Sequence, residues 1–231
     1  DILFSYDVND LTEDEKKEFH STYPNTSSYT FERFKNDVQL ALQLFFEEKV
    51  EYASKCLKLP QDILRVNADI IACFEHRKYE RFTFYTRDKF IPGIKFYNTD
   101  TNKKIINYPE KHRINCEAKN KDTEGKFKDS IRIFKNFNRE LKDRKIIDTK
   151  LAPSYFIENM IYNCSPQVFN DSYSDIVLKV FQFFINDIKN RRFKYYQCAN
   201  EQDLLFVNNW NETDAITFIN HSVDLFLEKI W

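Results

Sequence analysis

The chain of 231 residues can form one sizeable domain or two small lobes, and its 42% hydrophobic and 31% charged residues are typical of a soluble globular protein. A net charge of -1 excludes a general attraction to nucleic acid or acidic membranes, so any polyanion site must be a local concentration of charge. Two glycines in the whole sequence exclude the glycine-rich phosphate loops of Rossmann and P-loop proteins from this stretch.

The cysteines are widely spaced, contain no CxxC pair and are odd in number: Cys56, Cys73, Cys116, Cys164 and Cys198. This pattern predicts reduced thiols rather than a disulfide framework or a zinc site. No apolar run approaches the ~20 residues of a membrane span, and no signal peptide opens the chain. We therefore expect a cytoplasmic protein with no membrane partner.

The first half of the sequence predicts mainly strands. Residues 2–6 favour a strand, 13–19 a short helix in a polar segment, and apolar positions from Phe31 onward follow helical spacing, with Ser28 or Thr30 as N-cap. Residues 50–75 are expected to form two strands turning near 60–62, and 94–97 and 104–108 a further pair.

After Pro109 the pattern becomes helical. Helices are expected near 127–143, 153–163, 174–192 and 213–230, the last two with clear apolar stripes. The sequence thus predicts a β-rich lobe over residues 1–108 and a helical lobe over residues 109–231.

Residues 65–75 are expected to form one strand with an apolar face made of alternate residues: Val66, Ala68, Ile70, Ala72 and Phe74. Asp69 lies on the other face, and Asp is poorly suited to a strand interior. Periodicity alone favours a solvated Asp69 on a half-exposed strand. The alternative is a Mg²⁺ ligand, because a rigid strand holds a carboxylate with little freedom.

A second candidate site is a row of basic residues at helical spacing: Lys128, Arg132, Lys135, Arg139 and Lys142. Such a one-sided stripe suits a polyphosphate clamp, although most stripes of this kind are simply solvated faces. The next helix is expected to start with Pro153 at its first position, so its free N–H groups can face an anion. The ordinary role of Ser154 there would be capping.

Several segments, in order, resemble the cGAS/DncV-like nucleotidyltransferases (CD-NTases). The segment from Asp69 to Glu75, DIIACFE, resembles that family's third catalytic carboxylate strand. The opening DILFSYD resembles the strand after its paired acidic motif, with Asp1 matching the second carboxylate. Residues 126–135 followed by PSYFIE resemble its helical lobe.

The segment 109–123 resembles the family pattern PxxHxxNGxxKN, with Cys116 where Gly is usual and with Arg113 and Ile114 as further departures. By resemblance, Asn115 would read a base edge and favour a uridine-containing product, since an amide offers both a donor and an acceptor. A loop or helix-end Asn is the alternative. His112 is expected to be structural.

The resemblance implies an α+β, polymerase-β-like fold with a mixed-sheet palm and a C-terminal helical lobe. Asp1 and Asp69 would bind two Mg²⁺ ions, or Mn²⁺, facing the cationic helix across a cleft. Lys135 and Ser154 would hold the donor triphosphate, and Tyr155 would stack on its base. The family's Gly-Ser motif and first carboxylate would lie before Asp1, so the sequence resembles the larger C-terminal part of such an enzyme.

The implied reaction joins nucleoside triphosphates into a cyclic di- or oligonucleotide with release of pyrophosphate. The expected partners are these substrates and a downstream cyclic-nucleotide-responsive effector in bacterial anti-phage signalling. A monomer without a stable nucleic-acid partner is expected. Two alternatives stay open: a related nucleotidyltransferase acting on RNA or protein, and a non-catalytic nucleotide-binding relative.

Overall fold

The computed structural model describes residues 4–23, 29–47, 50–63, 65–83, 88–206 and 210–230. The chain divides into two compact units, with Glu110 in the first and Lys111 in the second. The boundary expected after residue 108 lies beside this division. Within the described ranges, no helix combines the length and apolar character needed to cross a membrane.

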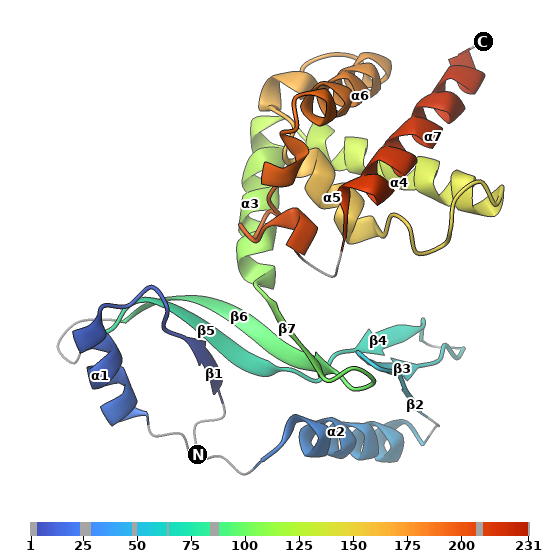
Figure 1. Ribbon diagram of the computed structural model, residues 1–231. Helices are drawn as coiled ribbons and strands as arrows, with labels where there is room; N and C mark the ends of the chain where they lie inside the picture. The colour runs from blue at the N-terminus through green and yellow to red at the C-terminus, as the bar shows by residue number, and fades with distance from the viewer. Residues whose placement is uncertain are drawn as a thin grey trace. The chain divides into compact units, whose positions relative to one another are not determined.

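The first unit contains a four-stranded sheet in the order β1-β5-β6-β7 (Figure 1). Its strands are β1 (Phe4–Asp7), β5 (Phe74–Arg81), β6 (Lys89–Asn98) and β7 (Lys103–Asn107). β1 pairs in parallel with β5, whereas the other neighbours are antiparallel. The sheet is therefore mixed, as the resemblance implies.

Helix α1 (Glu13–Thr22) begins with a capping box, in which Thr12 and Glu15 satisfy each other's backbone N–H groups. Its Phe19 is fully buried and makes an edge-to-face contact with Tyr79 of β5 at 4.9 Å between ring centroids. The helix predicted over 13–19 is confirmed, and this aromatic cluster fixes it against the sheet.

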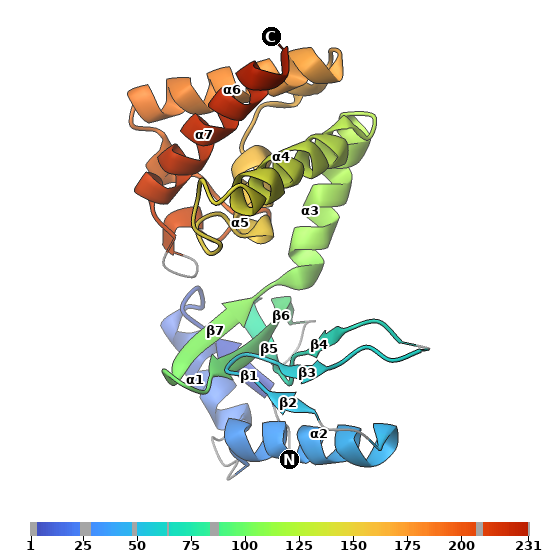
Figure 2. The same ribbon diagram turned by 90° about the vertical axis from the view of Figure 1, so that its right-hand side faces the viewer.

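A separate three-stranded sheet, in the order β2-β3-β4, packs against α2 (Figure 2). Its elements are α2 (Phe31–Phe46), β2 (Glu51–Tyr52), β3 (Leu57–Leu59) and β4 (Ala68–Ile70). Leu57 and Leu59 are almost completely buried against Leu42 and Phe46 of the helix. Thr30, one of the two predicted caps, accepts a hydrogen bond from the Arg33 N–H.

The single strand predicted over residues 65–75 is wrong. β4 and β5 are separate strands in different sheets, and residues 71–73 between them belong to neither. The alternation of buried positions continues through this break, because Ala72 is buried while Ile71 is 45% exposed. The pattern in the sequence is therefore the same as that of one continuous strand. Val66, expected on the apolar face, lies before β4 and is 80% exposed.

Gly93 of β6 is required by close packing at the end of the sheet. A Cβ at this position would lie 2.8 Å from the carbonyl oxygen of Asn107 and 2.8 Å from the Tyr108 ring. Both atoms are held by the β6–β7 pairing, so a side chain would force strands or ring apart.

The second unit consists of helices around an aromatic core that includes the fully buried Phe127, Phe134, Phe156 and Phe184. The helices are α3 (Pro109–Asp122), α4 (Lys126–Asp143), α5 (Ser154–Tyr162), α6 (Tyr173–Lys189) and α7 (Glu212–Ile230). Short 3-10 turns, η1 (Pro166–Phe169), η2 (Phe193–Tyr195) and η3 (Leu204–Phe206), connect them. The four predicted helices are confirmed within a few residues.

Helix α3 was not placed by the sequence analysis. Its inward-facing residues are polar, namely His112, Asn115, Cys116 and Lys119, and Cys116 is the one that is fully buried. Because they leave no apolar stripe, helical periodicity in hydrophobicity does not reveal the helix. A helix that turns polar groups inward needs partners for them, and these partners form the site described next.

Candidate functional site

Asp69 lies in the middle of β4 and is exposed, while its neighbours Ala68 and Ile70 pack toward the α2 core. Its register partner on β3 is Lys58, whose ammonium forms an ion pair with Glu51 at 2.9 Å. The carboxylate therefore projects from a short strand that an apolar core holds in place, as the functional interpretation requires. Asp1 lies outside the described residues, so its pairing with Asp69 stays a prediction.

The Cys56 thiol lies near Asp69. Burial is the main reason that the pKa of this thiol is raised, and the negative charge of Asp69 raises it further.

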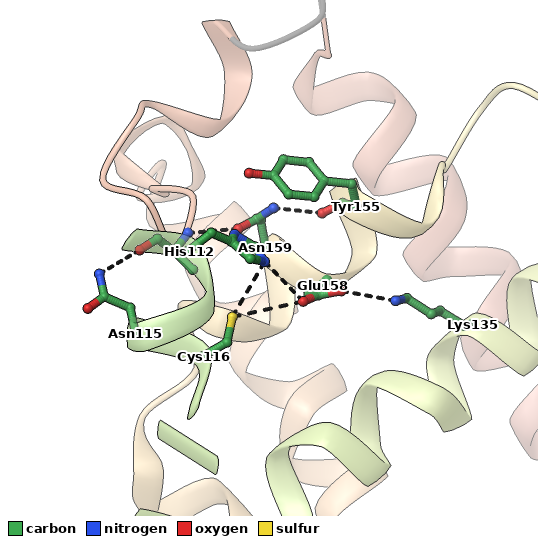
Figure 3. A network of polar contacts seen from close by, with 8 residues as sticks. His112, Asn115, Cys116, Lys135, Tyr155, Glu158 and Asn159 are labelled. Atoms are coloured by element: carbon green, nitrogen blue, oxygen red, sulfur yellow. Dashed lines mark hydrogen bonds and ion pairs between the residues drawn. The ribbon is translucent and has the colours of Figure 1, made fainter. Parts of the chain in front are cut away.

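The predicted basic stripe is present on α4, but its members differ in their surroundings. Lys128, Arg132 and Arg139 are exposed, whereas Lys135 and Lys142 are half-buried. The Lys142 ammonium contacts the carbonyl oxygen of Ala152 at 3.4 Å. Lys135 donates to Oε2 of Glu158 on α5 at 3.0 Å, so the lysine expected to bind phosphate is held by a carboxylate here (Figure 3).

Glu158 is the centre of the polar cluster inside the helical unit. Its Oε1 atom lies 3.1 Å from Nε2 of His112, on the side opposite to the Lys135 contact. These two partners, His112 first, lower the pKa of Glu158 to about 2 in spite of burial. Glu158 is therefore a fixed negative charge that positions a histidine and a lysine.

Tyr155 packs its ring on His112, with centroids 4.9 Å apart and planes inclined by 31°. Trp210 contacts the same ring at 5.8 Å. The Tyr155 hydroxyl is buried without a hydrogen-bond partner among the described residues, and burial raises its pKa. The ring is partly exposed, so base stacking on it stays a prediction.

Asn115 is anchored through its amide nitrogen. Nδ2 donates to the carbonyl oxygen of Ala199 at 2.6 Å, and the N–H of Ala199 donates to Oδ1 of the buried Asn159 at 2.7 Å (Figure 3). Asn159 in turn donates to the carbonyl oxygen of Tyr155. One N–H of Nδ2 is engaged in this way, so Oδ1 and the second N–H are the groups that Asn115 can offer to a ligand.

Ser154 is exposed at the first position of α5. The expected place of Pro153 at that position is wrong by one residue: Pro153 is the N-cap, with extended backbone angles. Its carbonyl oxygen accepts from the N–H groups of Phe156 and Ile157. The N–H groups that precede these two in the first turn, including that of Ser154, have no acceptor within the helix, so an anion can bind there.

The structure brings His112, Asn115, Lys135 and Tyr155 into one cluster through Glu158 and Asn159. No role was predicted for Glu158 or Asn159. A signal for Asn159 was present, since an amide between the apolar residues Ile157 and Met160 needs buried hydrogen-bond partners. Glu158 follows Ser154 by one helical turn, and its partner Lys135 lies on another helix, so the local sequence does not indicate the pair.

The helical unit matches the family model described as "cGAS/DncV-like nucleotidyltransferase C-terminal helical domain" over residues 114–227. A cyclic nucleotide synthase of Staphylococcus haemolyticus is 38% identical over 94% of this chain and 72% of the relative. A cyclic UMP-AMP synthase of Rhodothermus marinus is 33% identical over 97% of this chain and 75% of the relative.

Among solved structures, the R. marinus c-UMP-AMP synthase with Apcpp and Upnpp is similar with a TM-score of 0.80 and 30% identity, over 98% of this chain and 74% of that one. A cyclic dinucleotide synthase of Elizabethkingia meningoseptica with GTP and Apcpp has a TM-score of 0.74 and 31% identity, over 89% of this chain and 74% of that one.

The mixed four-stranded sheet, the separate sheet that carries the exposed Asp69, and the helical unit form an α+β fold that this chain shares with nucleotidyltransferases. The chain belongs to the cGAS/DncV-like nucleotidyltransferase family. The predicted family and fold class are thereby confirmed.

Proposed function

We propose that this protein joins nucleoside triphosphates into a cyclic di- or oligonucleotide, with release of pyrophosphate at each bond formed. One observation carries the proposal: 98% of the chain aligns, at a TM-score of 0.80, with a cyclic UMP-AMP synthase solved with two nucleoside triphosphate analogues. The exposed Asp69 and the polar cluster around Glu158 are chemically suited to that activity.

Asp69, the one proposed metal ligand of this chain among the described residues, fits a divalent cation. Asp69 is an exposed carboxylate on a strand whose other face is fixed by the α2 core, and hard ions such as Mg²⁺ prefer such oxygen ligands. Asp1 is the proposed second ligand of this chain. Bound Mg²⁺, or Mn²⁺, would acidify the attacking ribose hydroxyl and stabilise the charge of the leaving pyrophosphate.

Lys135 and Ser154 are the proposed triphosphate ligands. The Lys135 ammonium is 32% exposed while it binds Glu158, so one of its three donors can turn to a phosphate without leaving the carboxylate. Ser154 stands exposed at the start of α5, where hydroxyl and N–H groups are available to an anion. Tyr155 is the proposed stacking surface for the base.

Asn115 is the proposed base-reading residue. One N–H of its Nδ2 group is held by Ala199, which leaves Oδ1 and the second N–H for a base edge. An acceptor beside a donor can pair with the imide N–H and a neighbouring carbonyl of uracil, and on this basis we propose a uridine-containing product. We further propose that the product acts on a cyclic-nucleotide-responsive effector in anti-phage defence, and that the enzyme works in the cytoplasm as a monomer.

The variant Asp69→Asn tests the catalytic assignment. The amide keeps the shape but loses the charge, so we expect product formation from labelled nucleotides to fall by at least about a hundredfold, beyond the range typical of outer-shell metal partners. Thin-layer analysis with the four nucleotides, with and without RNA, measures the product and separates cyclisation from RNA modification.

The matched control is Asp100→Asn, which removes an exposed carboxylate in the β6–β7 turn of the same unit. Both variants should melt within a few degrees of the wild type, because neither side chain is buried. Full turnover by Asp69→Asn would contradict the assignment.

The variant Lys135→Ala tests the phosphate clamp. Loss of the ammonium should raise the KM for the nucleotides severalfold with a smaller effect on kcat, since a contact made in both ground and transition states is removed. Lys150→Ala, which removes an exposed lysine of the same unit, serves as control. An unchanged KM for Lys135→Ala counts against the clamp.

A further inference from the structure

Three potential metal ligands meet between α3 and α5. Nε2 of His112 lies 3.6 Å from Sγ of Cys116 and 3.1 Å from Oε1 of Glu158, and the sulfur lies 3.9 Å from the same oxygen (Figure 3). His112 and Cys116 are four residues apart on one helix, a spacing that points two ligands to the same side. The three atoms lie within 4.8 Å of one another.

These separations match the edges of a zinc coordination sphere. With Zn–S near 2.3 Å and Zn–N and Zn–O near 2.0 to 2.2 Å, the ligand atoms of a tetrahedral ion are about 3.3 to 3.6 Å apart. The observed contacts scatter around those values, so the ion needs only small shifts of side chains. Helices α3 and α5 hold the three residues without a flexible loop.

The surroundings of the three atoms are those of a built metal site. Cys116 is 4% exposed, and the side chains of His112 and Glu158 are 16% and 25% exposed. Lys135 holds the second carboxylate oxygen and so orients Glu158, as outer partners of ligating carboxylates do.

We propose that His112, Cys116 and Glu158 form a Zn²⁺ site that joins α3 to α5, with a fourth position for water or another ligand. A nitrogen, a sulfur and an oxygen together favour zinc, whereas Mg²⁺ takes oxygen ligands. The proposal does not rest on the cyclic-nucleotide synthesis proposed above, because none of these three residues is proposed there to bind Mg²⁺ or nucleotide.

Binding removes a proton from each of two ligand atoms: the S–H bond of Cys116 and the Nε2–H bond that faces Glu158 break, and Zn–S and Zn–N bonds form. The thiol proton leaves to solvent, and the imidazole takes up a proton at Nδ1 in exchange for the one lost from Nε2, so it remains neutral. Because the thiol must lose its proton to bind the ion, the affinity for zinc should increase with pH. The ion takes Oε1 of Glu158, so Oε2 can keep its contact with Lys135.

Cobalt(II) is the probe. After metal has been removed with a chelator, the protein should bind one equivalent of Co²⁺. The complex should show a thiolate-to-cobalt charge-transfer band and the visible bands of tetrahedral cobalt. Zn²⁺ should displace the Co²⁺ and so remove both signals. Cys116→Ala should lose the charge-transfer band. Cys198→Ala, which removes a buried thiol of the same unit outside the cluster, should keep it.

Glu158→Gln retains the thiolate and should weaken cobalt binding at least about tenfold while the charge-transfer band survives at saturation. This variant decides the matter if Cys116→Ala fails to fold. Zn²⁺ should also raise the Tm of the wild type and of Cys198→Ala by several degrees, and Mg²⁺ should not reproduce this shift.

The absence of a charge-transfer band in the stripped wild type, or its survival in folded Cys116→Ala, would overturn the zinc site. Either result would leave a metal-free hydrogen-bonded cluster of His112, Cys116 and Glu158. A band that Cys198→Ala removes would place the thiolate ligand elsewhere and would equally overturn it.

Discussion

At the residue scale, Glu158 links side chains from α3 and α4 to its own helix α5, through His112 at 3.1 Å and Lys135 at 3.0 Å. Charge-assisted contacts of this kind are stronger than neutral ones in a buried setting. The position of Lys135, and with it the proposed triphosphate contact, depends on a carboxylate that never needs to touch the substrate.

Glu158→Gln should remove a pH-dependent part of the stability. The folded pKa near 2 lies below the ordinary 4.5, so the stabilisation is complete above pH 4.5 and is lost as the pH falls toward 2. The lowered pKa of Glu158 corresponds to about 3 kcal/mol of the free energy of unfolding at pH 7, and roughly half of this contribution is lost at pH 3. Denaturant unfolding in the presence of a chelator at both pH values measures this difference between variant and wild type.

Glu117→Gln is the matched control, because Glu117 is an exposed residue of α3 that pairs with Arg113 at the surface. Its effect should stay within about 0.5 kcal/mol at both pH values. A difference between Glu158→Gln and wild type that is equal at pH 7 and pH 3 would show that the lost charge is not responsible.

Single residues with chemically demanding positions were the easiest to find from the sequence. The sequence singles out Asp69 because Asp is unfavourable inside a strand, and in the structure this residue is exposed on β4. The roles of Cys116 and Asn159 could not be predicted in the same way. Their partners, Glu158 and Ala199, are 42 and 40 residues away in the chain, so only the packing of α3 and α5 brings them together.

At the element scale, α3 is attached to the end of α5 by a half-buried lysine. Lys119 donates to the carbonyl oxygens of Tyr162 and Cys164 at 2.6 and 2.5 Å, and its ammonium lies over the rings of Phe127 and Tyr162. Burial lowers the pKa of Lys119. Lys119 thereby supplies a donor to two carbonyl oxygens at the C-terminal end of α5, where the helix itself provides none.

Lys119→Met should destabilise the protein by about 2 to 4 kcal/mol, because two buried carbonyl oxygens lose their donor while the aliphatic volume is kept. Denaturant unfolding gives the value. Lys121→Met, at an exposed position of the same helix, should change the stability by less than about 0.5 kcal/mol. Equal effects of the two substitutions would refute the anchoring role of Lys119.

The success of sequence reasoning differed between elements for a physical reason. The apolar stripes of α4, α6 and α7 face a common core, so periodicity placed these helices well. Helix α3 turns polar groups inward, and the break between β4 and β5 preserves the alternation, so hydrophobic patterns gave no signal in either place. Both failures lie next to proposed functional residues, where local rules are commonly broken.

At the scale of the whole molecule, catalysis should depend on a divalent cation that folding does not require. Chelation with EDTA should abolish product formation from labelled nucleotides. The Tm of the first unit, which carries the exposed Asp69, should change little. Mg²⁺ alone should restore turnover. Synthesis that continues in excess EDTA would contradict the role proposed for Asp69 and Asp1.

The same experiment separates the two proposed metal sites. Mg²⁺ does not fit a site with a thiolate and an imidazole, so recovery of turnover with Mg²⁺ alone reports on the carboxylates. A zinc-dependent rise in Tm reports on His112, Cys116 and Glu158. Asp69→Asn should lose the first response and keep the second.

The resemblance seen in the sequence was enough to predict the fold class and the order of its lobes, because four short segments occur in the family's order. It was not enough to predict which partners each side chain has. Lys135 was expected to face a phosphate, and the structure pairs it with Glu158. Such exchanges are set by tertiary packing and leave no mark in the local sequence.

The anchoring of Asn115 has a consequence for how substrate preference can evolve. The backbone of Ala199, held in turn by Asn159, decides which end of the Asn115 amide a ligand meets. A chimaera that exchanges residues 197–203 for those of a relative with another product should therefore reorient the amide of the proposed base reader and change the preferred base. Product preference could then change through one connecting segment, with Asn115 itself kept.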